Sequence, residues 1–310
     1  MEAWLEGQDS RFKRKVLKIF EGAGVDRRYA IMDAHEVFLN TSFEERNDIY
    51  VREMKKLGKQ AFQKALLKSN WEANSIDFLI TVSCTGIMIP SVDAYLINDL
   101  KMRQDVVRLP VTEMGCAAGV SGIIYAKNFL KANPGKRAAV IALESPTATF
   151  QLNDYSMVNI VSAAIFGDGA ACVLLSSEAE ADGPTIVDEA MYHFYDATNM
   201  MGFKLVNTGL QMVLDKEVPQ KIADHFPNIV HPFLEKNGKK IVQTVEDLFG
   251  ELGKNIDDTK ETLRLYGNMS SATVLYVLER FMDKQPEKGE LGLMLSFGPG
   301  FSAQRVLLEF

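Results

Sequence analysis

VTEMGCAAGVSG, residues 111–122, joins a predicted β-strand to a predicted buried helix through a Gly-Cys step. This spacing puts Cys116 at the helix N-terminus, where the helix dipole favours a thiolate and exposed backbone N–H groups favour an oxyanion. The residues around it are all small: Gly115, Ala117, Ala118 and Gly119. Small residues let a substrate carbonyl approach the sulfur closely. From spacing alone, Cys116 is either a nucleophile or an inert cysteine in a packed helix.

On both sides of this stretch, periodic helical segments alternate with short apolar runs. Expected helices cover residues 43–68, 91–102, 117–132, 218–237, 239–252 and 270–284. Expected strands cover residues 76–82, 105–111, 137–143, 169–176, 185–193, 290–297 and 303–310. Because the strands are apolar on both faces, the pattern predicts a layered α/β fold with covered sheets.

The rhythm of the second half resembles that of the first. We interpret the chain as two fused halves, residues 1–183 and 184–310, that share one core and meet near Gly183. One feature breaks the rhythm, because the helix ending at Gly238 runs into the helix starting at Lys239 with no strand between them. An αα-hairpin would explain this, but in a duplicated fold it indicates a missing segment.

Composition excludes several classes of protein. The 310 residues carry 34 Lys and Arg against 41 Asp and Glu, a formal net charge of −7, and 47% are hydrophobic. This apolar content excludes disorder, and the acidic balance argues against nucleic acid as the main partner. No apolar run reaches the roughly 18 residues that span a membrane, and the N-terminus lacks the apolar core of a signal peptide. We therefore expect a cytoplasmic protein.

The cysteines do not indicate a disulfide framework or a metal site. Cys84, Cys116 and Cys172 form an odd, sparse set, and no CxxC, CxxH or HExxH pattern is present. A phosphate-binding GxxxxGK[ST] loop is absent as well. The three thiols are therefore either small buried hydrophobes or, in one case, a reactive nucleophile.

Three further motifs could carry chemistry. Asn268 precedes a Ser-Ser pair and an apolar helix, which favours a cap or turn residue; the functional alternative is an amide donor for a developing oxyanion. FGDGAA (166–171) and SFGPGF (296–301) are glycine-rich and too short for a dinucleotide fingerprint. Gly298 and Gly300 in the second motif either form a tight turn or bring backbone close to a ligand.

Together these motifs resemble the bacterial type III polyketide synthases, the chalcone and stilbene synthase family of thiolase-fold condensing enzymes. The resemblance is collinear over nearly the whole chain and rests on VDRRYAIM (25–32), VSCTGIMIPS (82–91), EMGCAAGVSG (113–122), IFGDGAA (165–171), MGF…GLQMVLDKEVP (201–219), LRLYGNMSSATVLYVLE (263–279) and SFGPG (296–300). Each motif is weak alone, and the set is specific. It implies a thiolase-like α-β-α-β-α fold.

The resemblance also implies a mechanism. Cys116 would take an acyl group from a CoA thioester, and Asn268 with a histidine would hold the malonyl-CoA carbonyl while CO2 leaves. The enolate would then attack the acyl-enzyme, a step that fixed hydrogen-bond donors assist. The implied partners are malonyl-CoA, a starter on CoA or on an acyl carrier protein, and a second copy of the chain as a homodimer. No metal or redox cofactor is implied.

Six further residues match family positions around the substrate. Phe166 matches an aromatic gatekeeper, and Met212 falls where the second gatekeeper, a Phe, often stands. Cys84 matches the cavity wall, and Ile89 matches a residue that reaches into the partner subunit. Lys15 and Lys18 fall where basic residues meet the CoA phosphates, although a solvated helix face explains them equally well.

Two departures from the family stand out. The opening strand and its glycine-containing loop are absent, so the start looks truncated. The catalytic histidine of the family lies in a His-Pro-Gly-Gly loop, which would fall between Gly238 and Lys239 and is missing there. His231-Pro232 is a tempting substitute, but its surroundings match the preceding surface helix. If the segment is merely absent from the sequence as given, the full protein carries the histidine and is active. If the omission is real, the chain lacks a general base and an oxyanion donor, and elongation is impaired.

Three alternatives stay open. The first is a ketoacyl carrier-protein synthase III type of enzyme, which performs a single condensation. The second, motivated by the missing histidine loop, is a non-catalytic thiolase-fold protein that binds acyl chains. A cysteine hydrolase is less favoured, because small residues that exclude water surround Cys116 and no Cys-His-Asn order fits the chain.

Overall fold

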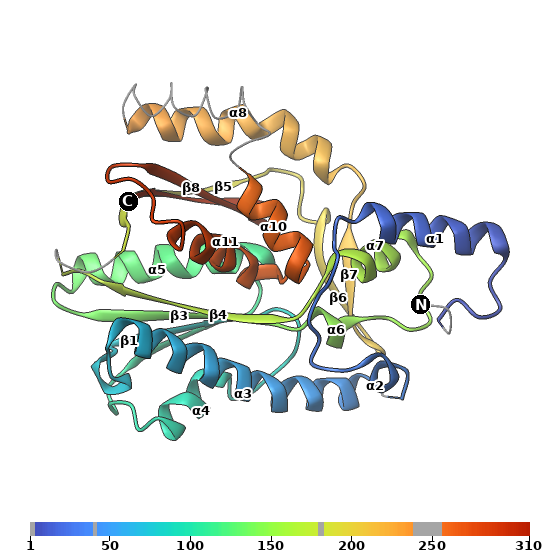
Figure 1. The fold of residues 1–310 in the computed structure, drawn as a ribbon, viewed down its shortest axis with the longest axis horizontal. Helices are drawn as coiled ribbons and strands as arrows, with labels where there is room; N and C mark the ends of the chain where they lie inside the picture. The colour runs from blue at the N-terminus through green and yellow to red at the C-terminus, as the bar shows by residue number, and fades with distance from the viewer. Residues whose placement is uncertain (1–3, 40–41, 179–182, 238–255) are drawn as a thin grey trace.

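Alternating layers of helices and sheets build the protein in the computed structural model, which describes residues 4–39, 42–178, 183–237 and 256–310. Figure 1 shows the order: α8 outermost, then the sheet of β5, β9 and β8, the helices α5 and α11, the sheet of β1 to β4, and finally α3 and α4. The predicted layered α/β class is therefore confirmed. Within the described residues, no helix is both long and apolar enough to cross a membrane.

The first sheet has the strand order β2-β1-β3-β4. Its strands are β1 (Phe78–Val82), β2 (Val107–Val111), β3 (Arg137–Glu144) and β4 (Gly169–Ser176). β1 runs parallel to β2 and β3, whereas β4 pairs antiparallel with β3. All five residues of β1 are buried, as the apolar run predicts for a strand covered on both faces.

The second sheet is smaller and has the order β5-β9-β8, with both pairs antiparallel. Its strands are β5 (Thr185–His193), β8 (Leu291–Gly298) and β9 (Ser302–Glu309). Among the described strands of this sheet no parallel pair exists, so the two halves differ here. The junction between Gly238 and Lys239 and the expected helix over residues 239–252 lie outside the described residues.

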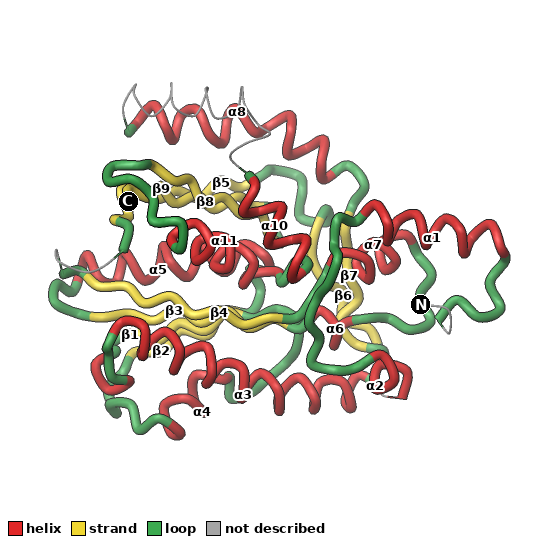
Figure 2. The backbone as a smooth tube through the Cα atoms, viewed as in Figure 1, coloured by secondary structure: helices red, strands yellow, loops and turns green. Residues whose placement is uncertain are grey.

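A separate hairpin, β6 (Met201–Val206) and β7 (Gly209–Leu214), pairs only with itself among the described strands. It lies at one end of the layers beside α6 (Pro146–Thr149) and α7 (Met157–Ile165), as Figure 2 shows. These strands were not predicted, because the segment stands out in the sequence only as a family motif.

Most expected helices are present. Helix α3 (Phe43–Ser69) starts with a capping box between Ser42 and Glu45 and ends at Asn70 in the left-handed conformation. The others are α1 (Ser10–Gly22), α2 (Ala34–Leu39), α4 (Val92–Asp99), α5 (Ala118–Ala132), α8 (Val218–Lys236), α10 (Asp257–Tyr266) and α11 (Thr273–Met282), with short 3-10 turns η1 (Ala73–Ser75), η2 (Gly115–Ala117) and η3 (Ser270–Ala272).

The central core lies between the two sheets, around α5. Val120 and Ile124 of this helix pack in one cluster with Ile80 and Val140 of the first sheet and Val306 of the second. A helix covered by a sheet on each side must be apolar around most of its circumference, which explains the sequence of α5. The same packing holds the N-terminal end of α5, and hence Cys116, at the boundary between the two halves.

Candidate active site

Cys116 lies in η2, the single turn that precedes α5, and not in the helix itself. Gly115 before it has φ +51°, a left-handed conformation that glycine adopts at little cost. The residue is half-buried, and its Sγ lies 3.3 Å from the Oγ of Ser270 in η3. The nucleophile candidate of one half therefore meets a hydroxyl of the other half.

Three glycines allow the segments around Cys116 to pack this closely. A Cβ on Gly115 would stand 2.4 Å from the Pro299 ring, and one on Gly298 would stand 2.4 Å from the Met114 carbonyl. A Cβ on Gly119 would stand 2.2 Å from the Ser271 carbonyl oxygen. Gly298 therefore packs directly against the turn that carries Cys116, and its predicted role in binding substrate stays a prediction.

Gly300 behaves differently from Gly298. It is exposed, its φ is +72°, and an added Cβ would meet nothing within 4 Å. The positive φ alone explains why glycine stands at this position of the turn. This geometry does not support the interpretation that Gly300 approaches a ligand.

Ser270 is a site residue that the sequence analysis missed. It has φ +51°, which is unusual for a residue other than glycine and indicates local backbone strain. Its Oγ lies within reach of two thiols, at 3.3 Å from Cys116 Sγ and 3.7 Å from Cys84 Sγ. The Ser-Ser pair ahead of a helix resembles an ordinary cap, so the sequence offered no specific signal.

Glu144 is a second missed residue. It ends β3, is completely buried, and accepts hydrogen bonds from the Cys84 backbone N–H (3.1 Å), the Thr85 hydroxyl (2.8 Å) and the Ser271 hydroxyl. Burial raises the pKa of Glu144, whereas these donors lower it. A carboxylate at the end of a strand whose preceding residues, 138–143, are all apolar is the signal that could have identified Glu144.

Cys84 lies near Cys116, because its Sγ stands 3.7 Å from the same Ser270 hydroxyl. Its Sγ stands 3.6 Å from Glu144 Oε2, and both burial and the negative charge of Glu144 hold the pKa of this thiol well above its usual range. Cys84 is therefore a protonated thiol near Cys116, which makes it a poor nucleophile.

The predicted acidity of Cys116 is wrong. The pKa of the Cys116 thiol is raised to about 11, chiefly by burial and to a smaller extent by the charge of Glu144, although the hydrogen bond with Ser270 opposes the rise. Loss of hydration around the sulfur therefore outweighs the effect of the helix end. The rise in pKa caused by burial is larger still for Cys172 in β4, so Cys116 remains the more acidic of these two thiols.

We expect the rate of Cys116 alkylation by iodoacetamide to rise about tenfold per pH unit between about pH 7 and 10, because only the thiolate reacts. The raised pKa keeps the thiolate scarce below about 11. Peptide mass spectrometry at each pH measures the rate for each cysteine, and Cys172 provides the slow internal control. A rate for Cys116 that levels off by pH 8 would contradict this prediction.

Asn268 forms the turn that carries η3. Its Oδ1 accepts hydrogen bonds from the Ser270 backbone N–H (2.9 Å) and the Thr273 hydroxyl (3.2 Å). The capping interpretation is therefore correct for the oxygen. In the described part of the chain, the Nδ2 group donates no hydrogen bond, so it remains available as a donor. A turn role and a donor role are compatible in this residue.

Phe166 lies beside Asn268, because the two residues form an isolated parallel bridge. The Asn268 N–H donates to the Ile165 carbonyl at 2.7 Å, and the Gly167 N–H donates to the Asn268 carbonyl at 3.1 Å. Met212 lies on β7 opposite Phe203 of β6. Both predicted gatekeepers are half-buried.

The remaining predicted residues lie on the surface. Ile89, in the loop before α4, is 93% exposed. Lys15 and Lys18 are exposed on α1. None of the three contacts Cys116 within the described residues, so the structure does not bring them together with the sulfur.

The four histidines of the chain are all described, and none contacts Cys116. His231 is exposed on α8, as predicted for a surface helix residue. His225, also on α8, shares a 3.1 Å hydrogen bond with the hydroxyl of Tyr192 in β5. A catalytic histidine beside Cys116 is therefore absent from the described residues.

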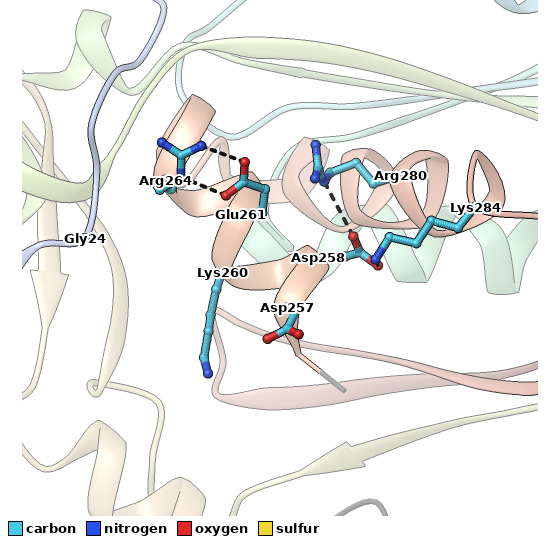
Figure 3. Close-up of a pocket in the computed structure, with 8 residues that line it drawn as sticks. All are labelled: Gly24, Asp257, Asp258, Lys260, Glu261, Arg264, Arg280 and Lys284. Atoms are coloured by element: carbon cyan, nitrogen blue, oxygen red, sulfur yellow. Dashed lines mark hydrogen bonds and ion pairs between the residues drawn. The ribbon is translucent and has the colours of Figure 1, made fainter. Parts of the chain in front are cut away.

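A surface hollow of about 510 Å³ lies away from these residues, between Gly24, α10 and α11 (Figure 3). Its charged groups largely neutralise one another, since Arg264 pairs with Glu261 and Asp258 pairs with both Arg280 and Lys284. It contains no residue that the sequence analysis singled out.

The layered fold, in which the turn η2 with Cys116 meets the turn η3 with Ser270, defines a thiolase-like condensing enzyme. Comparison with known proteins identifies the family. The profile for chalcone and stilbene synthases, N-terminal domain, matches residues 8–179, and the profile for their C-terminal domain matches residues 187–310. The chain belongs to the chalcone and stilbene synthases and is a type III polyketide synthase.

Individual relatives agree with this assignment. Phloroglucinol synthase of Pseudomonas fluorescens is 28% identical over 301 residues, covering 92% of this chain and 86% of the relative. A 1,3,6,8-tetrahydroxynaphthalene synthase of Streptomyces peucetius is 29% identical over 313 residues, covering 94% and 83%. The crystal structure of 1,3,6,8-tetrahydroxynaphthalene synthase from Streptomyces coelicolor superposes with a TM-score of 0.91 at 28% identity, covering 100% of this chain and 93% of that one.

Proposed function

We propose that this synthase condenses an acyl-CoA starter with malonyl-CoA through a thioester on Cys116. The observation that carries the proposal is the position of Cys116, half-buried where glycine-lined turns from both halves converge. In the first step the sulfur attacks the thioester carbonyl, the C–S bond to CoA breaks, and the thiol proton leaves with CoA. No external oxidant or metal takes part in this exchange.

In the second step malonyl-CoA loses CO2, and its electron pair forms an enolate that attacks the acyl carbon on Cys116. The new C–C bond releases the Cys116 thiolate, which takes up a proton. Negative charge develops on the malonyl thioester oxygen during loss of CO2, and the unengaged Nδ2 of Asn268 is suited to donate to it. The Ser270 hydroxyl, 3.3 Å from the sulfur, is suited to hold the thiol proton.

The same proposal assigns roles to the outer residues. Lys15 and Lys18 on α1 would meet the phosphates of CoA, and exposed Ile89 would contact the partner subunit of a homodimer. Two relatives are named as synthases of phloroglucinol and 1,3,6,8-tetrahydroxynaphthalene, both of which are polyhydroxylated aromatic compounds. This supports repeated condensation followed by ring closure.

The test combines malonyl-CoA with a panel of acyl-CoA starters and examines the products by mass spectrometry. We expect polyketides extended by more than one unit, together with a covalent acyl group on Cys116. Single condensations that occur only with an acyl carrier protein would instead indicate the ketoacyl synthase III type of reaction. Absence of both products and covalent acylation would overturn the proposal.

One observation favours a second candidate, a non-catalytic protein that binds acyl chains. The pKa of Cys116 is raised to about 11, and no histidine contacts it within the described residues. In that case acyl-CoA would bind reversibly, and intact mass spectrometry would detect no acyl-enzyme. Alkylation of all three cysteines at equally slow rates would support this candidate as well.

A further inference from the structure

The β6–β7 hairpin, which carries Met212, is held at its tip by two buried polar side chains. Arg46 of α3 is 3% exposed and donates from Nη2 to the Thr208 carbonyl and from Nε to the Ala148 carbonyl at 3.1 Å. Gln151 is 6% exposed; its Oε1 accepts from the Thr208 hydroxyl at 2.6 Å, and its Nε2 donates to the Leu210 carbonyl at 3.4 Å. We call Arg46, Gln151 and Thr208 the hairpin clamp.

The clamp acts on a part of the chain that cannot hold itself in place. Among the described strands, β6 and β7 pair only with each other, and an isolated two-stranded hairpin is marginally stable. The turn packs tightly on α3, since a Cβ on Gly209 would stand 2.7 Å from the Phe43 ring. The position of the hairpin therefore depends on its tertiary anchors.

The other end of the hairpin reaches the candidate active site. Gly202 of β6 lies next to Pro299, since a Cβ added to Gly202 would stand 3.9 Å from the Cβ of Pro299. Pro299 in turn packs against Gly115, the residue before Cys116. Gly202 pairs with Val213, the neighbour of Met212. Because Leu210, whose carbonyl the clamp holds, lies about 7 Å along the strand from Met212, a shift at the clamp moves Met212 relative to the sulfur.

We propose that Arg46 and Gln151 are positioning residues that set which lengths of acyl chain Cys116 accepts, by fixing the hairpin that carries Met212. The inference rests on the proposed function, because Met212 matters only if an acyl chain is loaded on Cys116. Lysine cannot replace Arg46 fully, since the planar guanidinium fork serves two carbonyls at once and an ammonium group is a single point charge.

The experiment measures acylation of Cys116 by saturated acyl-CoAs of increasing length, using intact mass spectrometry, in the full chain. We expect Arg46→Met to change the ratio of long-chain to short-chain acylation rates by about fivefold or more. The ratio for Arg46→Lys should lie between those of the wild type and Arg46→Met. Thr208→Val removes one hydrogen bond from an exposed residue, so it should fold normally and shift the ratio in the same direction. Arg52→Met, on the exposed face of α3, is the matched control and should leave the ratio unchanged.

Hydrogen exchange supplies a readout that needs no activity. Amides of residues 201–214 should exchange faster in Arg46→Met and Thr208→Val than in Arg52→Met. Equal rates in all variants overturn the clamp. Faster exchange with an unchanged length ratio overturns the inference while leaving the proposed function intact. A wild-type chain that no acyl-CoA acylates overturns the proposed function, and with it the role of the clamp in selecting acyl length.

Discussion

Cys116→Ala abolishes covalent acylation and lowers product formation by at least about 1,000-fold, because no other group can form the thioester. Cys84 is the second thiol within reach of the Ser270 hydroxyl, at 3.7 Å, but burial and the charge of Glu144 keep it protonated. Alanine is smaller than cysteine, so it introduces no clash in the turn η2. The fold should therefore survive, and the loss should be one of chemistry.

The matched control is Cys172→Ala in β4; Cys172 pairs with Ile141 of β3 and packs against the apolar cluster that contains Ile141. This change removes a sulfur of the same kind far along the chain, so it should retain product formation. Intact mass spectrometry after incubation with acyl-CoA, together with product analysis, measures both effects. Acylation that persists at full extent in Cys116→Ala would mean that another residue is the nucleophile.

Gly119→Ala should destabilise the protein by about 2–3 kcal/mol and slow acylation of Cys116 severely. The added Cβ would stand 2.2 Å from the Ser271 carbonyl oxygen and 3.2 Å from Val274. Because the opposing atom is backbone, relief requires α5 and η3 to separate. That movement would carry Ser270 away from Cys116 and disturb the turn that Asn268 forms.

Gly22→Ala at the end of α1 is the control for this substitution. An added Cβ there meets nothing within 4 Å, so the change should be neutral or stabilise the helix by at most about 1 kcal/mol. Thermal unfolding and the acylation rate are measured for both variants. Equal melting temperatures for the two would show that the contact between α5 and η3 is looser than the structure indicates.

Much of the fold could be predicted from local patterns. The expected helix over 43–68 is α3, and the apolar runs at 76–82 and 137–143 are β1 and β3. These elements are long or fully buried, so periodicity identifies them clearly. The β6–β7 hairpin was missed, because its strands form no part of a larger sheet and owe their position to Arg46 and Gln151, which are distant in sequence.

The candidate site divides in the same way. Cys116 and Gly298 could be placed from motifs, because a Gly-Cys step after a strand and a glycine-rich turn have few structural solutions. Ser270 could not, since it does not stand out until its turn meets the sulfur. Glu144 carries only the weak signal of a carboxylate at the end of an apolar strand, and its contact with Ser271 is decided by the tertiary structure. The pKa of Cys116 was predicted in the wrong direction for the same reason, as local spacing carries no information on burial.

The amino-acid sequence by itself determined the family, the layered class and the turn that presents Cys116, because these depend on residue types at fixed spacing along one segment. Tertiary structure alone decided the environment of the sulfur: the hydroxyl of Ser270, the carboxylate of Glu144 and the depth of burial. The physical reason is that desolvation and hydrogen bonding depend on which atoms surround a group. Here the serine turn lies more than 100 residues along the chain from both Cys116 and Glu144.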